Sequence, residues 1–124
     1  MRYGFLFLIL IGFFAKSTQP KVCEKFRTGS FKHIGVDGIN TLIERNDTIQ
    51  IETNPDKGSK LIASINWLSD CQYRLTYIDV NVPDYKFLIG TSFNVDIVPI
   101  SKNTYKYTAY DDSYKIEGEI LKIN

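Results

Sequence analysis

Residues 65–77 read INWLSDCQYRLTY, two apolar-alternating arms that meet at a turn. Alternation with a period of two is typical of a β-strand with one buried face. A three-residue loop at 68–70 sets Trp67 opposite Cys71 and gives every residue on that face an apolar or aromatic partner. A two-residue loop would set Trp67 opposite Gln72. We therefore expect a hairpin with the longer loop and with Trp67 on its buried face.

The same register predicts further pairs on this face, namely Ile65 with Tyr73, Ala63 with Leu75 and Leu61 with Tyr77. From Phe26 onward, alternation continues and turn-forming residues interrupt it at nearly regular intervals, which indicates an antiparallel meander. No long helical stripe appears. The pattern predicts strands near 26–35, 40–45, 48–53, 60–67, 71–78, 93–100, 104–110 and 114–122.

The C-terminal half supports the same test of register. A loop at 101–103 sets Ile97 against Tyr107, Val95 against Ala109 and Pro99 against Tyr105. A two-residue turn at Asp111 and Asp112 then brings Tyr107 to Ile116 and puts Gly118 opposite Tyr105, where the missing side chain leaves room for the ring. The 40–53 hairpin stays open, because either register leaves Glu44 or Arg45 on the apolar side.

One interval, residues 81–92 (NVPDYKFLIGTS), interrupts the meander. Pro83 suits the first turn of a helix and Gly90 its end, so we expect a short helix near 84–89. Eight strands are enough to close an up-and-down barrel, which removes exposed sheet edges. The predicted fold is therefore an all-β antiparallel barrel, with a β-sandwich as the alternative.

The N-terminal segment has the layout of a secretory signal peptide, with Arg2 followed by an apolar run over residues 4–15. Twelve residues are too few to cross a bilayer comfortably, so we expect cleavage before Thr18, and membrane contact only through this segment before cleavage. The expected domains are a signal peptide, 1–17, and one β domain, 18–124. Without the signal, thirteen basic residues stand against fourteen acidic ones. This near-neutral balance argues against nucleic acid as a partner.

The mature chain contains two cysteines, Cys23 and Cys71. Export would carry them into a compartment where disulfides persist, so we expect them to be bonded to each other. Closing this loop would stabilise the fold by on the order of 4 kcal/mol in the chain-entropy model. A redox or metal-binding role is disfavoured, because there is no CxxC pair and His33 has no soft ligand near it in sequence.

Sequence motifs for chemistry are scarce. There is no glycine-rich phosphate loop, HExxH or GxSxG motif, and only one histidine, His33, which lies close to Asp37. A His–carboxylate pair could move protons, but a histidine at a strand end near a glycine turn is the more ordinary interpretation. We expect no catalytic residue, no metal and no cofactor.

Aromatic residues are the one compositional excess. The predicted inner face carries Trp67, Tyr73, Tyr77, Phe93, Tyr105 and Tyr107. In a small barrel such rings either fill the interior, which is the commoner case, or line a cavity for an apolar ligand. If there is a cavity, we expect ligand contacts from Trp67, Tyr73, Tyr77 and Tyr107. Outward rings at Tyr85, Tyr110 and Tyr114 could instead serve a protein partner.

Four stretches, CEKFRTGSF, ERNDTIQIE, INWLSDCQYRLTY and FLIGTSFNVDI, resemble an uncharacterised family of small exported bacterial β proteins. The resemblance covers essentially the whole mature chain. Some members carry the name DNA topoisomerase IV, but this chain has neither the length nor the charge for a strand-passing enzyme. The likeness to lipocalin-type barrels is architectural only, since Gly29 is followed by Ser30 and Phe31 and the Gly-x-Trp signature is absent.

The functional expectation is a non-enzymatic, exported barrel that binds a small apolar ligand or a protein partner. The alternatives are a small hydrolase or isomerase that uses His33 with a carboxylate, and a purely structural envelope protein. The expected location is the periplasm, the cell envelope or the medium.

Overall fold

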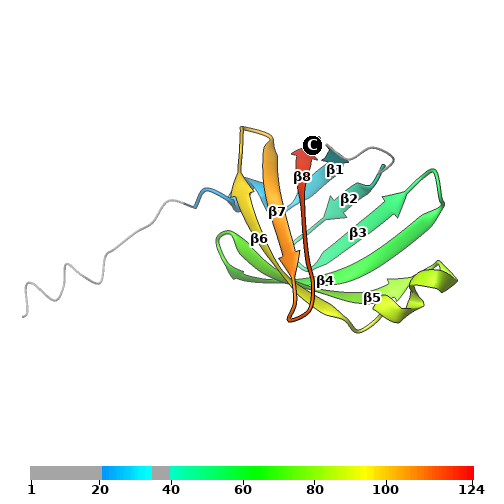
Figure 1. Ribbon diagram of the computed structural model, residues 1–124. Helices are drawn as coiled ribbons and strands as arrows, with labels where there is room; N and C mark the ends of the chain where they lie inside the picture. The colour runs from blue at the N-terminus through cyan, green and yellow to red at the C-terminus, as the bar shows by residue number, and fades with distance from the viewer. Residues whose placement is uncertain (1–20, 35–39) are drawn as a thin grey trace, which may run out of the picture.

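The computed structural model describes residues 21–34 and 40–124, and these form a closed barrel of eight antiparallel strands (Figure 1). Each strand pairs with the next, and the last pairs with the first, which confirms the predicted meander and barrel. The predicted signal peptide, 1–17, lies outside the described residues. In chain order the strands are β1 (Gly29–Ile34), β2 (Leu42–Arg45), β3 (Ile49–Asn54), β4 (Ser59–Ser69), β5 (Gln72–Val80), β6 (Ser92–Pro99), β7 (Thr104–Tyr110) and β8 (Lys115–Lys122).

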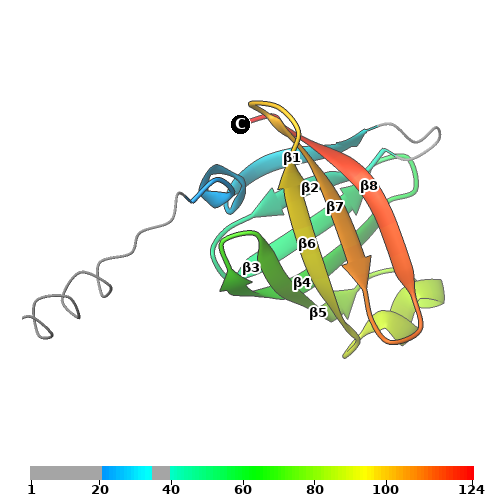
Figure 2. The ribbon, with the colours of Figure 1, turned by 60° about the vertical axis from the view of Figure 1, so that its left-hand side comes forward.

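Two short 3-10 helices lie at opposite ends of the barrel (Figure 2). The second, η2 (Pro83–Leu88), confirms the short helix expected near 84–89. The first, η1 (Glu24–Phe26), replaces the predicted start of the first strand, because the amide of Phe26 donates to the carbonyl of Cys23 and turns the chain before β1 begins. Within the two described ranges, no helix is long and apolar enough to cross a membrane.

From Ala63 to Trp67 the register of the β4–β5 hairpin differs from the predicted one by two residues, with Trp67 paired to Tyr73, Ile65 to Leu75 and Ala63 to Tyr77. A further irregularity between Ile62 and Ala63 makes the difference three at Leu61, which pairs with Val80. The turn contains two residues, Asp70 and Cys71, and Leu68 is an extra, bulged residue on β4. The three-residue loop was therefore wrong. Since a shift of two keeps every side chain on its face, Trp67 and Tyr73 still lie together inside.

The second half of the barrel confirms one register and corrects the other. The pairs of Ile97 with Tyr107, Val95 with Ala109 and Pro99 with Tyr105 are as predicted. Between β7 and β8 the connection is four residues long, with the amide of Asp111 donating to the carbonyl of Tyr114. As a result Ala109 faces Ile116, and Gly118 faces Tyr107 instead of Tyr105.

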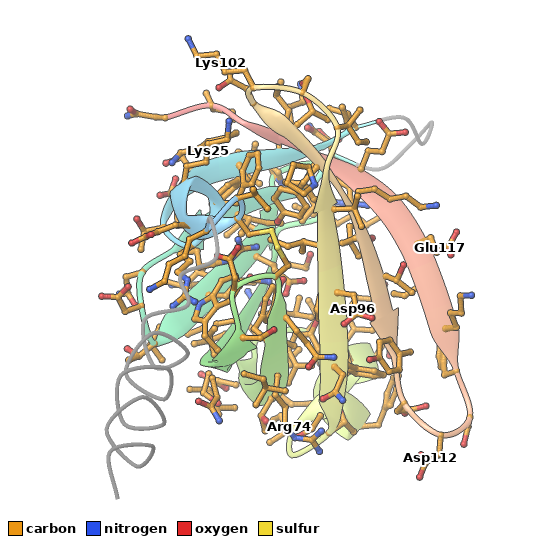
Figure 3. All side chains as sticks on the ribbon, turned by 90° about the vertical axis from the view of Figure 1, so that its left-hand side faces the viewer. Lys25, Arg74, Asp96, Lys102, Asp112 and Glu117 are labelled. Atoms are coloured by element: carbon orange, nitrogen blue, oxygen red, sulfur yellow. A yellow bond between two sulfur atoms is a disulfide. The ribbon has the colours of Figure 1, made fainter. Side chains whose placement is uncertain are left out.

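The hairpin that the sequence left open, β2–β3, turns Arg45 inward and Glu44 outward. Arg45 is only 4% exposed, whereas Glu44 accepts a hydrogen bond from the Ser30 hydroxyl on the outer surface. Many other charged side chains point outward, and Figure 3 shows Lys102, Asp112 and Glu117 pointing away from the barrel. Arg45 and Glu52, which both line the interior, are charged groups that the barrel must accommodate.

The predicted disulfide between Cys23 and Cys71 is present, with the two Cα atoms 5.3 Å apart. It joins the segment before η1 to the β4–β5 turn. The carboxylate of Asp70, in the same turn, also accepts the amide of Cys23 at 3.2 Å. A disulfide agrees with a compartment outside the reducing cytoplasm.

Candidate ligand-binding cavity

One end of the barrel is closed by η1. The Phe26 ring is fully buried and packs against Tyr105, with ring centroids 5.0 Å apart. Phe31 on β1 lies against the same tyrosine at 6.1 Å. The interior of an eight-stranded barrel is narrow enough for large side chains to fill it. This part of the interior is therefore solid, and we call it the closed end.

Trp67 belongs to the closed end. Its ring is 4.8 Å from that of Tyr73, and the guanidinium of Arg27 lies 4.5 Å above it in a cation–π contact. Arg27 also donates to the carbonyl of Ser69. Trp67, on β4, is therefore packed between Arg27, which follows η1, and Tyr73, and it is not among the residues that line the barrel's cavity.

The rest of the interior is hollow, with a cavity of about 590 Å³. This volume lies within the range of small-molecule sites. Three of the four predicted contacts, Tyr73, Tyr77 and Tyr107, line it. Its apolar wall comes from several strands and includes Ile43, Leu61, Leu75, Phe93, Val95, Ala109, Ile116 and Ile120. Of the two arrangements that the sequence left open, rings that fill the interior are found only at the closed end, and the remaining rings line a cavity.

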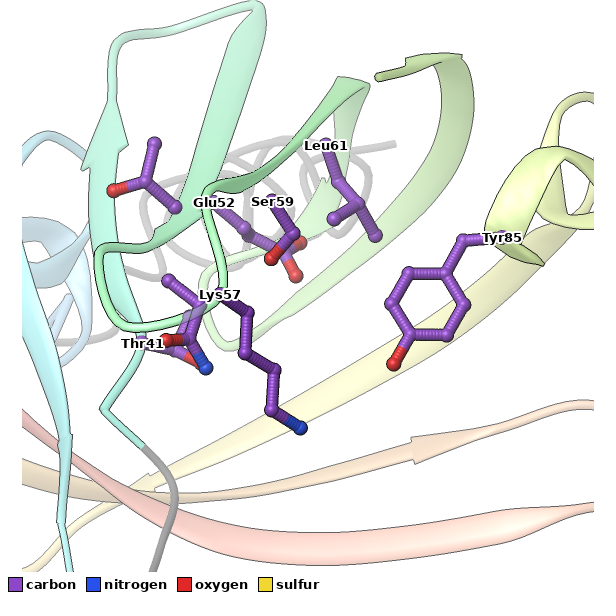
Figure 4. A pocket seen from close by; sticks show the side chains of 8 residues that line it. Thr41, Glu52, Lys57, Ser59, Leu61 and Tyr85 are labelled. Atoms are coloured by element: carbon purple, nitrogen blue, oxygen red, sulfur yellow. The ribbon is translucent and has the colours of Figure 1, made fainter. Parts of the chain in front are cut away.

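The cavity opens at the end that carries η2. Its rim includes Phe87, which is 72% exposed, and Tyr114, which is 57% exposed. Tyr85, also exposed, projects from η2 toward the β3–β4 turn, where a smaller hollow of about 180 Å³ adjoins the cavity (Figure 4). The two spaces share the side chains of Thr41, Glu52, Leu61 and Tyr85. Tyr85 and Tyr114, expected to be outward rings, thus border the mouth.

At the floor of the cavity, Arg45 holds the closed end together. Its Nε donates to the Gln50 side chain at 2.8 Å, and its Nη1 donates to the carbonyl of Phe26 at 2.8 Å. Its Nη2 donates to the hydroxyls of Tyr105 at 2.9 Å and Tyr73 at 3.4 Å. The rings of Phe31 and Tyr73 also face the guanidinium. These contacts are what allow a charge to sit inside a small barrel.

Glu52 on β3 is half-buried. It lies on the same inward face as Gln50, two residues further along the strand and closer to the mouth. It accepts hydrogen bonds from Gln50 Nε2 at 2.9 Å and from the Tyr77 hydroxyl at 3.1 Å. Burial raises the pKa of the Glu52 carboxyl, and this effect outweighs the opposing hydrogen bonds and the charge of Arg45. Burial also raises the pKa of Tyr77. The side-chain amide of Gln50 therefore links a buried cation to a half-buried acid.

His33 lies in the cavity wall and pairs with a hydroxyl. Its Nε2 is 2.8 Å from the oxygen of Tyr107, whose pKa is raised by burial to about 12. Burial lowers the pKa of His33, which favours the neutral ring. A Cβ at Gly118 would lie 2.7 Å from the Tyr107 ring and 2.8 Å from His33 Nε2, so only glycine leaves space for this pair. Asp37, considered as its acidic partner, lies outside the described residues.

Sequence reasoning missed two functional features of this site. Arg45 was one of two candidates for the apolar side, and nothing in the local pattern favoured it over Glu44. Glu52 lies on the hairpin whose register the sequence left open, so its side chain was not assigned to either face. In the observed β2–β3 register, Arg45, Gln50 and Glu52 lie on one face. This group of polar side chains could have indicated the site, but it can be recognised only once the register is known.

The chain was compared with protein-family models, with curated proteins and with solved structures, and none of the three comparisons found a match.

Proposed function

We propose that this barrel is a binding protein that holds a small, largely apolar molecule in its interior. The observation that carries the proposal is the cavity of about 590 Å³, closed at one end by η1 and open at the other beside η2. A mostly apolar wall with a few convergent polar groups is the usual composition of a small-molecule site.

Binding is better supported than proton-transfer catalysis. The partner of His33 among the described residues is the hydroxyl of Tyr107, a weak acid whose pKa is raised to about 12. General acid–base work near neutral pH needs a group that titrates there, together with an orienting partner. A protein partner on the outer surface has less support, because two of the three tyrosines considered for it, Tyr85 and Tyr114, border the cavity mouth.

We place this activity outside the cytoplasm, in the periplasm, the envelope or the medium. The disulfide and the signal-like segment over residues 1–17 support this location. We also propose kinship with the small exported bacterial β proteins that the sequence resembles.

The test is titration with N-phenyl-1-naphthylamine, an uncharged dye that fluoresces in apolar surroundings. We expect saturable binding with one dye per barrel. In Ala109→Trp the ring would occupy the cavity, so affinity should fall by about tenfold or more. Lys106→Trp, on the exposed face of the same strand, is the matched control and should bind like the native protein.

Two outcomes would contradict the proposal. One is a native protein that does not take up the dye. The other is an Ala109→Trp variant that keeps the native circular dichroism spectrum and binds the dye with native affinity.

A further inference from the structure

The floor of the cavity gathers hydrogen-bond donors around one buried cation. The hydroxyl oxygens of Tyr105 and Tyr73 both accept from the same nitrogen, Arg45 Nη2. An oxygen that accepts in this way still has its own O–H proton to donate. Within the described part of the chain, neither hydroxyl has an acceptor for that proton. Two phenol donors therefore lie free at the floor, beside a positive charge.

The positive charge itself has only neutral direct partners among the described residues. Arg45 donates to an amide, a backbone carbonyl and two hydroxyls, and the salt bridges found in the described ranges are on the outer face of β7 and β8. Glu52 is linked to it only through Gln50. Because a buried charge without an opposite charge is costly, the floor is complementary to an anion.

The walls above the floor limit what that anion can be. Between floor and mouth the cavity is bordered mainly by aliphatic and aromatic side chains, and the mouth itself carries the exposed rings of Phe87 and Tyr114. A free inorganic anion would leave this apolar surface uncovered. A molecule with one charged end and an apolar body covers both parts.

We propose that the ligand is an amphiphile with a carboxylate head, which accepts hydrogen bonds from the Tyr73 and Tyr105 hydroxyls beside Arg45 while its apolar body extends toward the mouth. The inference rests on the proposed function and specifies its ligand class. A carboxylate matches the floor because it offers two oxygens to two phenols and one negative charge to one guanidinium.

Glu52 is the group that could oppose this ligand. Its oxygens already accept hydrogen bonds from Gln50, on the same strand, and from Tyr77 on β5, two strands away. Burial raises the pKa of its carboxyl above the ordinary value. At the floor itself, the two tyrosine hydroxyls and the Arg45 guanidinium have no anion in direct contact among the described residues, whereas Glu52 lies nearer the mouth with its oxygens engaged.

The experiment compares three ten-carbon amphiphiles as competitors for the bound dye on the native protein: decanoic acid, decan-1-ol and decylamine. If the floor binds a carboxylate through charge-assisted hydrogen bonds, decanoic acid should displace the dye at a concentration about tenfold lower than decan-1-ol does. Dye binding with equal or better displacement by the alcohol or the amine would overturn the carboxylate inference and leave the proposed function standing. A protein that does not take up the dye would overturn both.

Variants that lack a tyrosine hydroxyl test the proposed carboxylate site at the floor. Tyr73→Phe and Tyr105→Phe keep the rings and remove one donor each, so we expect each to lower the acid-to-alcohol ratio and their combination to bring it within about threefold of unity. Tyr110→Phe removes a hydroxyl that bonds Gln72 and Asp96 on the outer face, and should keep the native ratio. A folded double variant with the native ratio would contradict the proposal, and if the double variant does not fold, the single variants provide the same test.

Discussion

The two ends of this barrel are built from the same alternating strands, but one end is filled by side chains and the other opens into the cavity. At the closed end, η1, the disulfide and Arg45 bring Phe26, Phe31 and Tyr105 into one filled cross-section. At the open end, η2 lies to one side of the mouth and has no buried residue of its own. The contrast indicates that stability is concentrated where the chain covers the barrel, and that the space for a ligand lies at the end that η1 does not cover.

The largest test of this contrast is removal of the disulfide. Replacing both cysteines by alanine, Cys23→Ala with Cys71→Ala, should lower the free energy of unfolding by about 4 kcal/mol, since the bond closes a loop with a sequence separation of 48. Urea unfolding followed by the fluorescence of Trp67, the sole tryptophan, measures this. A loss below about 1 kcal/mol would show that η1 holds the closed end without the bond.

A phenylalanine at each end gives a matched comparison. Phe26→Ala should cost about 3 kcal/mol, because it empties the fully buried plug of the closed end. Phe87→Ala removes a ring that is mostly in solvent and should change stability by less than about 0.5 kcal/mol. Both are read from urea unfolding. Equal losses of unfolding free energy in the two variants would show that stability is not concentrated at the closed end.

Gly118→Ala probes the wall between the ends. The added Cβ would collide with Tyr107 and His33, so we expect a cost of about 2 kcal/mol and separation of the two side chains. Once His33 moves toward water, its lowered pKa should rise toward the ordinary value, as measured by NMR titration of the ring protons. If Gly118→Ala keeps native stability and the native titration of His33, the backbone around Gly118 accommodates the methyl group without displacing Tyr107 or His33.

Glu52→Gln should give the smallest effect, visible mainly in its pH dependence. Because burial raises the pKa of Glu52 in the folded protein, the folded chain holds this proton more tightly than the unfolded one, and the group's contribution to stability is lost as pH rises above about 4.5. The melting temperature of the variant, relative to the native protein, should therefore increase from about pH 4 to about pH 8. Glu44→Gln, on the outer face of β2, is the control and should show little change. A constant difference for Glu52→Gln would contradict the buried carboxyl.

The sequence predicted the closed barrel and the disulfide because both depend on features that survive small errors. Sliding the β4–β5 hairpin by two residues leaves Trp67 and Tyr73 on the same face, so the inner set of side chains was correct although the pairs were not. The bulge at Leu68 has no local signal, since a leucine there fits a loop as well as a strand. Bulges are decided by how the whole strand meets its neighbours.

The candidate site was less predictable. Tyr73, Tyr77 and Tyr107 were placed inward by alternation, but whether their rings fill the barrel or border a space depends on summed side-chain volumes and on where η1 lies. Trp67 was assigned to the cavity and instead packs under Arg27, because alternation gives the face of a strand and not the height along the barrel. The inward turn of Arg45 required the register of two hairpins at once.

The path of the chain has a practical consequence for orientation. β1 starts and β8 finishes at the closed end, where the carbonyl of Asn124 accepts the amide of Ser30 at 2.9 Å. A molecule attached through Asn124, to a biosensor chip for example, would therefore have its closed end toward the chip surface. Every immobilised copy would present its opening to the flowing solute, so capture through the carboxyl terminus is the geometry in which uptake can be followed without obstruction.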